Sequence, residues 1–171
     1  MPARYGKLCR EVLAVLLWSS ASAALAEPGN SAFSSGKASA EVIEPLSVRA
    51  ERDLNFGKIQ HPSAATRTVI PNESTQSGGS SAARFRVTGA ALRHYGIMIP
   101  SQVDAEGLAS GAKIPVRDIQ AYSKFLNATG ERGRLDAHGR DVVYVGGTID
   151  IEGSLPEDVY SAEILISVAY D

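Results

Sequence analysis

The feature that most constrains the fold is an alternation of side chains at the carboxyl end of the chain, over residues 159–171. Polar side chains occupy most of one register, with Leu165 and Ala169 as exceptions. A period of two is typical of a β-strand that buries one face. The sequence therefore predicts one long strand here, and a sheet elsewhere in the chain that covers its apolar face. That face carries Tyr160, Ala162, Ile164, Ile166, Val168 and Tyr170.

The first 26 residues have the parts of a secretory signal peptide. Basic residues lie within the first ten positions, an apolar run covers residues 12–18, and small residues precede Glu27. We predict cleavage before Glu27 and export to the periplasm, the cell surface or the medium. A membrane anchor is the alternative, but the apolar run is far shorter than the roughly 20 residues that span a bilayer. No later stretch comes near that length, so we expect no membrane span after cleavage.

Cleavage would leave residues 27–171, which is enough for one domain with its own core. The only cysteine, Cys9, lies in the predicted signal peptide, so disulfides and cysteine metal sites are excluded from the remainder. The formal net charge of −2 argues against a nucleic-acid partner, because such partners select a basic surface. We divide the chain into a signal peptide at 1–26, a flexible leader at 27–37 and a β-domain at 38–171.

Short alternating segments separated by turn residues continue through the rest of the chain. None has a helical period over ten residues, although a short helix competes with a strand at 114–125. Polar loops are expected at 72–81, 101–113 and 127–141. About seven to eight strands of this kind predict an all-β, immunoglobulin-like antiparallel β-sandwich. The expected strands cover residues 38–50 with an interruption at Pro45, 54–56, 66–70, 83–88, 95–99, 114–125, 142–151 and 159–171.

Three details of strand geometry follow from the pattern. Segments 83–88 and 95–99 are close enough in sequence to be antiparallel neighbours. A bulge near Asp118 would bring the apolar residues of its strand onto one face. A second bulge, at Gly146 and Gly147, would do the same for the strand that contains them.

No group of residues predicts catalysis. His138 lies near Asp136 and Asp141, but their spacing matches no metal-ligand motif, and exposed loops commonly carry such residues. No Gly-x-Ser-x-Gly segment marks a nucleophile, and no Gly-Lys-Ser/Thr segment marks a phosphate loop. We therefore predict a non-enzymatic protein with no catalytic residue, no metal site and no cofactor.

Short motifs follow one another in a characteristic order. They are Val42-x-x-Pro45-Leu46-x-Val48, Asp53-Leu54-Asn55-Phe56-Gly57, Phe85-x-Val87-x-Gly89, Ile97-x-Ile99-Pro100, Val145-Gly146-Gly147-Thr148 and a final strand that ends Val168-x-Tyr170. This order resembles the bacterial domain-of-unknown-function 4402 (DUF4402) family over nearly all of residues 27–171. The resemblance implies a structural role for the motif residues Leu54, Phe56, Gly57, Gly146 and Gly147.

That family is in turn similar to spore coat protein U domains and to the pilins of chaperone-usher fimbriae. In those pilins the sandwich lacks one strand, which a periplasmic chaperone supplies first and the leader of the next subunit supplies later. The resemblance implies a pilus-like or cell-surface structural subunit that assembles by β-strand addition, with a chaperone and like subunits as partners. It also implies that the closing segment, from Tyr160 to Tyr170, is an assembly strand.

Two departures from those pilins keep a second interpretation open. Spore coat pilins usually carry a disulfide, which this chain cannot form after cleavage, and the leader before residue 38 has only Phe33 as a large apolar residue. A self-contained sandwich is the alternative. It would be an extracellular binding module that recognises carbohydrate or a surface protein through the loops at 72–81 and 127–141.

Overall fold

The computed structural model describes residues 34–60 and 64–171. The predicted signal peptide and the first part of the predicted leader lie outside these residues. Glu41–Asp171 forms one compact unit, which is described here by itself, apart from the unit Met1–Ala40. The described residues contain no α-helix, and thus no helix long and apolar enough to cross a membrane.

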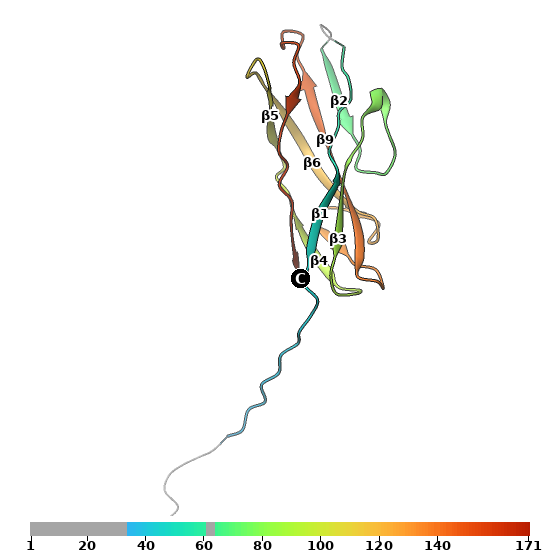
Figure 1. Cartoon of the computed structure of the whole chain (residues 1–171), viewed down its shortest axis with the longest axis vertical. Coiled ribbons are helices and arrows are strands. Elements are labelled where there is room, and N and C mark those ends of the chain that lie inside the picture. Colours follow the sequence, from blue (N-terminus) through green and yellow to red (C-terminus); the bar gives the residue numbers. More distant parts are fainter. Residues whose placement is uncertain (1–33, 61–63) are drawn as a thin grey trace, which may run out of the picture. The chain divides into compact units, whose positions relative to one another are not determined.

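The strands of the compact unit form two antiparallel sheets (Figure 1). The larger sheet has the order β1-β3-β9-β6-β5-β10, with β2 paired to β9 and β7 paired to β6, and the smaller sheet has the order β11-β4-β8. The prediction of an antiparallel β-sandwich is confirmed, with more and shorter strands than expected. The strands are β1 (Ser47–Arg52), β2 (Ala65–Val69), β3 (Ala83–Thr88), β4 (His94–Met98), β5 (Val103–Gly107), β6 (Lys113–Ser123), β7 (Ala128–Thr129), β8 (Arg132–Arg134), β9 (Arg140–Ile151), β10 (Tyr160–Ser161) and β11 (Ser167–Tyr170), with one 3-10 turn at Ser77–Gly79.

The larger sheet has two tiers, because different strands pair with the two halves of β9. Residues 140–145 of β9 pair with β3, and residues 147–151 pair with β2. On its other edge, β9 pairs with β6 along both halves. We call the half that contains β3 the lower tier, and the half that contains β2, β5 and β10 the upper tier (Figure 1).

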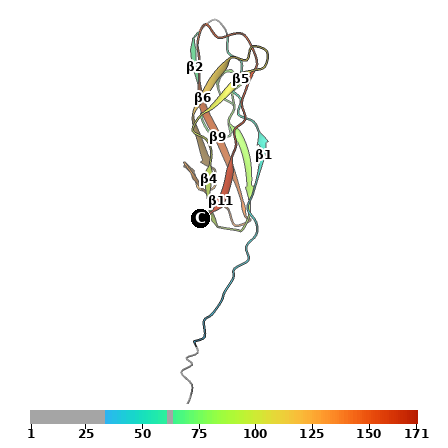
Figure 2. The same cartoon turned by 90° about the vertical axis from the view of Figure 1, so that its left-hand side faces the viewer.

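The smaller sheet covers only the lower tier. β9 has 12 residues and extends about 40 Å, whereas β4, the longest strand of the smaller sheet, has 5 residues and extends about 17 Å. Figure 2 shows β4 and β11 in the lower part of the unit, with β2 and β5 above them. Among the residues that the structure describes, no strand of the smaller sheet therefore packs over the inner face of the upper tier.

The apolar core runs along the whole inner face of the larger sheet. Where the smaller sheet packs on it, Val87, Val143 and Tyr95 of β4 have no exposed surface. In the upper tier, Val116 is 3% exposed and Ile149 is 7% exposed, and both belong to the same apolar cluster. The core is thus continuous along the larger sheet, and irregular segments rather than a second sheet bury its upper end.

A buried carboxylate joins the two sheets in the lower tier. Asp141 on β9 accepts hydrogen bonds from the hydroxyl of Tyr95 on β4, at 2.7 Å, and from the hydroxyl of Ser123 on β6. It also accepts the backbone N–H groups of Phe125 and Val142. Burial, together with this hydrogen bond, raises the pKa of the Tyr95 phenol. Polar contacts, in addition to apolar packing, therefore fix the position of the smaller sheet.

The prediction that the strands at 83–88 and 95–99 are antiparallel neighbours is wrong. β3 lies between β1 and β9 in the larger sheet, whereas β4 lies between β11 and β8 in the smaller one. The connection contains a turn in which the Arg93 N–H bonds the Ala90 carbonyl, and Leu92 has a positive φ of 61°. This turn carries the chain from one sheet to the other instead of closing a hairpin.

Two of the predicted loops contain strands. β5 lies within residues 101–113, and both β7 and β8 lie within residues 127–141. β7 has only two residues, and β5 and β8 carry glycine and charged residues, so no apolar period marks any of these strands in the sequence. Pairing with β6 and β4 holds them in place.

The expected strand at 38–50 begins later than predicted. Residues 38–46 form no strand, Val42 is 96% exposed, and β1 starts only at Ser47. The expected short strand at 54–56 is a single bridge between Asn55 and Ser81. Both segments alternate in sequence but have no neighbouring strand to complete a ladder.

The closing segment is not one continuous strand. β10 pairs with β5 in the larger sheet, β11 pairs with β4 in the smaller sheet, and residues 162–166 between them have no partner strand among the described residues. The predicted alternation persists in the burial of Ile164, Ile166 and Val168, each half-buried between exposed neighbours. The segment crosses from one sheet to the other while keeping one side toward the core.

Of the two predicted bulges, only the first is present. Asp118 has a positive φ of 52°, and the register of β6 against β9 shifts between Arg117 and Gln120. The bulge predicted at Gly146 and Gly147 is wrong, because β9 runs through both residues without a shift of its own. A Cβ at Gly146 would lie 2.1 Å from the Val69 carbonyl oxygen, so this glycine permits a close backbone approach.

Candidate functional site

A groove of about 1220 Å³ lies along the inner face of the upper tier and reaches β3 in the lower tier. Its floor consists of apolar side chains from β3, β5, β6 and β9. All of these side chains except Ile151 are at most 8% exposed, because the segments beside the groove pack against them. The floor residues are Ala83, Phe85, Ala105, Ile114, Val116, Ile149 and Ile151.

Two irregular segments form the rims of the groove. One rim is residues 53–60, which follow β1, and the other is residues 155–164, which include β10. Because residues 162–166 have no partner strand among the described residues, they form an open edge beside the groove. An apolar floor next to an open edge is the arrangement that an added β-strand requires.

Asp158 anchors the second rim. Its Oδ2 atom accepts hydrogen bonds from the Ser110 N–H at 2.7 Å, the Ser110 hydroxyl at 2.7 Å and the Ala109 N–H at 2.9 Å. The bonds from Ser110 are the main cause that lowers the pKa of Asp158 to about 2. The Tyr160 hydroxyl donates to the Pro156 carbonyl at 2.8 Å. The rim therefore has a defined position although most of it belongs to no ladder.

Charged side chains along the rims are mainly acidic. Asp53, Glu157, Asp158 and Glu163 line the groove, against the single basic residue Lys58. At neutral pH these carboxylates favour an occupant that carries basic residues beside its apolar ones.

The six residues predicted for the assembly strand are divided between two places. Tyr160, Ala162 and Ile164 line the groove. Ile166, Val168 and Tyr170 pack against the core toward the smaller sheet instead.

Tyr170 has a clear structural role. Its hydroxyl donates to the Glu44 carbonyl at 2.8 Å and accepts the Ala90 N–H at 2.6 Å, and a Cβ at Gly89 would lie 2.2 Å from it. These contacts tie β11 to the segment that enters β1. The penultimate tyrosine thus fixes the lower end of the unit and does not reach the groove.

The family-motif residues lie in two places, the first rim and β9. Leu54, Phe56 and Gly57 belong to the first rim. Gly57 has a φ of 74°, and a Cβ there would lie 2.2 Å from the Gly78 carbonyl oxygen, so only glycine fits this turn. Gly146 and Gly147 lie on β9, where β2 and β6 pass close to its backbone.

The residues around His138 do not form a metal site. Its ring Nδ1 is 4.0 Å from a carboxylate oxygen of Asp136, whose other oxygen accepts the Arg140 and His138 N–H groups. These bonds, first that from Arg140, lower the pKa of Asp136. Asp141 is turned toward Tyr95 in the core. Within 34–60 and 64–171, no group of three or more potential ligand residues is placed to hold a metal ion.

Sequence reasoning missed the first rim and the floor as parts of a site. Leu54 and Phe56 are two positions apart, as are the inward residues of β6 and β9. This period of two shows which face of each segment is apolar. Which part of a face stays uncovered depends on the length of the smaller sheet. No local signal in the sequence carries that information.

Comparison with known proteins identifies the family of the chain. The family model described as "Domain of unknown function (DUF4402)" matches residues 46–170, which include both rims, the floor and both sheets. No curated protein matches the chain. The matched region begins where the chain enters β1 and ends within β11, so it coincides with the sandwich itself. The chain therefore belongs to the DUF4402 family.

Proposed function

We propose that the protein is an exported, non-enzymatic structural subunit that assembles when a β-strand of a second copy enters the groove. The observation that carries the proposal is the combination of an apolar floor with an unpaired edge at residues 162–166. Main-chain hydrogen bonds to that edge would provide affinity, and alternate side chains on the floor would provide specificity. A strand in this place would complete the sandwich.

The proposed occupant is the leader of the second copy, at residues 34–46. This segment forms no strand and is exposed up to Pro45. Its backbone is available before Glu44, whose carbonyl accepts the Tyr170 hydroxyl. Ala38, Ala40 and Val42 alternate and would point to the floor together. Lys37, directly before Ala38, belongs to the opposite register and would point away from the floor.

The leader would fill the groove incompletely. Alanine buries little apolar area, and a floor contact contributes about 25 cal/mol per Å², so most of the affinity would come from main-chain hydrogen bonds. We therefore expect each junction to be weak and to strengthen when the leader carries larger side chains.

Sedimentation velocity at increasing concentration tests the proposal. Residues 27–171 should form growing assemblies, whereas residues 47–171 should stay monomeric and bind a synthetic peptide of residues 34–46. Amide shifts at Ala105 and Ile149 on the floor would locate the peptide. If residues 27–171 stay monomeric and the amides of the leader are protected from hydrogen exchange, the leader occupies the groove of its own copy. A peptide that causes no amide shifts on the floor would overturn the proposal.

A matched pair of leader variants tests the register. Ala40→Ile adds a large side chain on the predicted floor side and should strengthen assembly about tenfold, because burying an isoleucine contributes about 1.5–3 kcal/mol. Ser39→Ile adds the same side chain to the opposite register and should have little effect. Equal strengthening by both variants would contradict a strand with this register.

The open edge is tested independently of the leader. Proline removes a backbone N–H, and alternate residues of an extended segment direct this group to opposite sides. One of the variants Ala162→Pro and Glu163→Pro should therefore block assembly, while the other leaves it nearly unchanged. If both still assemble as well as the wild type, residues 162–166 do not receive the added strand.

Export is tested by amino-terminal sequencing of the protein recovered outside the cytoplasm, which should begin at Glu27.

A further inference from the structure

The outer face of the larger sheet carries a row of large side chains that the strand-addition proposal does not use. Register pairs place Arg84 on β3 beside Tyr144 on β9, Tyr144 beside Tyr122 on β6, and Tyr122 beside Thr129 on β7. The loop after β2 crosses this row. Between the loop and the row lies a depression of about 510 Å³.

The hydroxyl of Tyr144 is the unusual group in this depression. Tyr144 is 1% exposed, and its hydroxyl oxygen is buried without a hydrogen bond of good geometry. The nearest acceptor is the Glu73 carboxylate, whose pKa is lowered mainly by Lys124 and also by Tyr144. A buried hydroxyl without a well-formed hydrogen bond is destabilising, and native proteins rarely keep one without a reason. Burial raises the pKa of this phenol, so it stays protonated and can donate at neutral pH.

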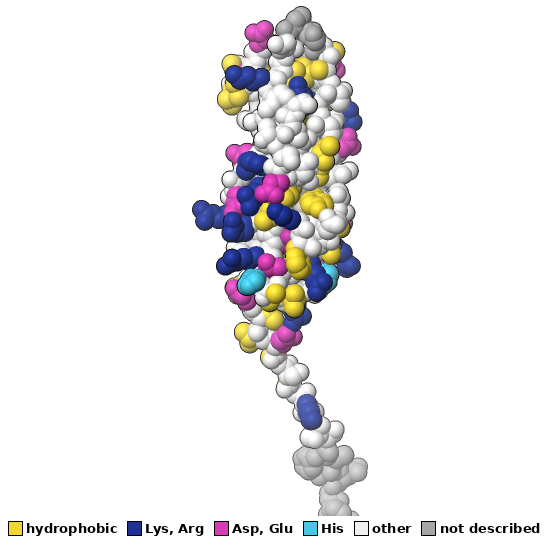
Figure 3. Space-filling view, turned by 90° about the vertical axis from the view of Figure 1, so that its right-hand side faces the viewer, with side chains coloured by type: hydrophobic (Ala, Val, Ile, Leu, Met, Phe, Trp, Pro, Cys, Tyr) yellow, Lys and Arg dark blue, Asp and Glu magenta, His cyan; other side chains and the backbone are white. Residues whose placement is uncertain are grey.

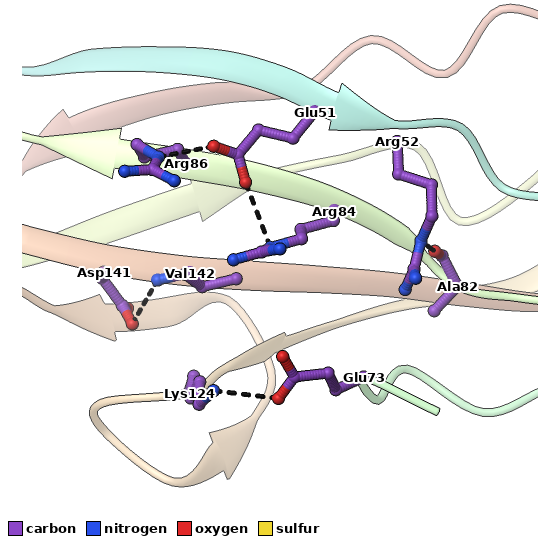
Figure 4. Close-up of polar contacts among 9 residues, drawn as sticks. All are labelled: Glu51, Arg52, Glu73, Ala82, Arg84, Arg86, Lys124, Asp141 and Val142. Atoms are coloured by element: carbon purple, nitrogen blue, oxygen red, sulfur yellow. Dashed lines mark hydrogen bonds and ion pairs between the residues drawn. The ribbon is translucent and has the colours of Figure 1, made fainter. Parts of the chain in front are cut away.

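An ion pair covers the phenol and can be displaced. Lys124 on β6 and Glu73 on the loop approach to 3.0 Å, and both side chains are more than half exposed (Figure 4). Exposed pairs of this kind contribute little to stability. A ligand could therefore separate Lys124 from Glu73 and reach the Tyr144 hydroxyl.

The chemistry of the lining favours a ligand with several hydroxyl groups. Gln120, Asn72 and Thr129 supply both donors and acceptors, which matches hydroxyls that donate and accept at once. Pro71 and Tyr122 supply apolar and aromatic surface for carbon-bound hydrogens.

An anion fits the same lining poorly. Glu73 would repel a carboxylate or phosphate. The guanidinium groups of Arg52 and Arg84 each have one acceptor nearby, although Arg52 Nη2 and Arg84 Nε are buried without a hydrogen bond of good geometry. Arg84 lies 3.0 Å from Glu51, and Arg52 donates to the Ala82 carbonyl at 2.9 Å (Figure 4). Figure 3 likewise shows acidic side chains among the basic ones over the lower half of the unit.

We propose that the depression between the loop at residues 70–73 and the outer faces of β6, β7 and β9 binds a neutral pyranose unit of a polysaccharide. The Tyr144 hydroxyl, Gln120 and the separated Lys124–Glu73 pair bond its hydroxyls, and Tyr122 packs against its ring. The inference does not depend on the groove, which lies on the opposite face of the same sheet.

Amide-shift titration of residues 27–171 with methyl glycosides tests the site. The probes are the methyl glycosides of glucose, galactose, mannose and N-acetylglucosamine, with methyl glucuronide and inorganic phosphate as anionic arms. At least one neutral glycoside should give saturable shifts at Gln120 and Thr129, with a dissociation constant on the order of 1 mM for a ligand of this size. Shifts that saturate only with the anionic probes, or with none of the probes, overturn the proposal.

Two variants with matched controls separate binding from folding. Tyr144→Phe removes only the buried hydroxyl and should weaken binding about tenfold without lowering the melting temperature. Gln120→Ala should also weaken binding, whereas Gln102→Ala, which removes an exposed glutamine from another loop, should not. Retained affinity in both Tyr144→Phe and Gln120→Ala would place the sugar elsewhere.

The ion pair supplies a further control. Glu73→Gln frees Lys124 and should alter glycoside affinity, whereas Glu41→Gln breaks the exposed pair with Arg93 and should leave it unchanged. Strand assembly, measured by sedimentation, should be unaffected by Tyr144→Phe. Failure of sugar binding with intact assembly would therefore refute this inference alone.

Discussion

At the scale of single residues, Asp141 is the group on which most buried polar contacts converge. Hydroxyls from both sheets and two backbone N–H groups donate to its carboxylate. The residue therefore couples the position of β4 to that of β6 and β9.

Replacement of Asp141 should be strongly destabilising. Asp141→Ala removes the acceptor of two buried hydroxyls, at about 1–3 kcal/mol each, so the free energy of unfolding should fall by at least about 2 kcal/mol. Asp141→Asn keeps one acceptor oxygen and should cost less. Urea denaturation measures the difference, with Asp104→Asn, at an exposed position of β5, as the control. A loss for Asp141→Ala as small as that of the control would refute the role assigned to Asp141.

Asp158 gives the second rim a pH dependence. Its pKa in the folded protein is about 2, below the value of about 3.9 for an unperturbed aspartate. A lowered folded-state pKa stabilises the fold fully above the unfolded pKa, and this contribution is lost as pH falls from about 4 to about 2. The melting temperature of Asp158→Asn should therefore fall less than that of the wild type as the pH is lowered through that range. Parallel melting curves would show that the contacts with Ser110 contribute nothing in solution.

At the scale of elements, β9 organises the molecule because three strands pair along its two edges. Gly146 is the point where β2 ends and the chain turns away, with the Val69 carbonyl and Pro71 nearest to it. Any side chain at this position would meet backbone atoms, which cannot rotate away. The glycine thus serves the crossing of two strands and the loop that follows β2.

Gly146→Ala should reduce stability through this steric conflict. The added Cβ would lie 2.1 Å from the Val69 carbonyl oxygen, and overpacking of this kind costs about 1–3 kcal/mol. Gly96→Ala on β4 is the control, since its nearest neighbour would be 3.7 Å away. Thermal unfolding of both variants measures the effect, and equal melting temperatures would contradict the predicted clash.

The elements that were predictable share one property, which is a strong apolar period. β3 alternates without interruption. β6 alternates on either side of a change of register, from which the bulge at Asp118 was predicted. β5 carries aspartate, glutamate and glycine among its five residues, so its pattern resembles a loop. Gly146 was misassigned because a glycine pair is compatible with either a bulge or a close approach, and only the neighbouring backbone distinguishes the two.

At the scale of the whole molecule, unequal coverage should produce unequal local stability. The lower tier lies under the smaller sheet, whereas the upper tier borders the groove. Opening the upper tier exposes less buried surface and therefore costs less free energy. Native-state hydrogen exchange should show the amides of Val143 and Val145 at least about tenfold better protected than those of Ile149 and Ile151. Addition of the leader peptide should reduce the difference, and uniform protection without the peptide would contradict the two-tier description.

The class of fold and the inward face of most long strands were predictable from the sequence, because both follow from a local period of two. So was the closing segment, whose alternation persists in the burial of Ile164, Ile166 and Val168. The division of this segment between two sheets, and the lack of a partner strand for residues 162–166 within 34–60 and 64–171, became visible only in the folded structure. Partner choice and strand coverage depend on contacts between residues far apart in the chain, and a local pattern specifies which face is apolar but not what covers it.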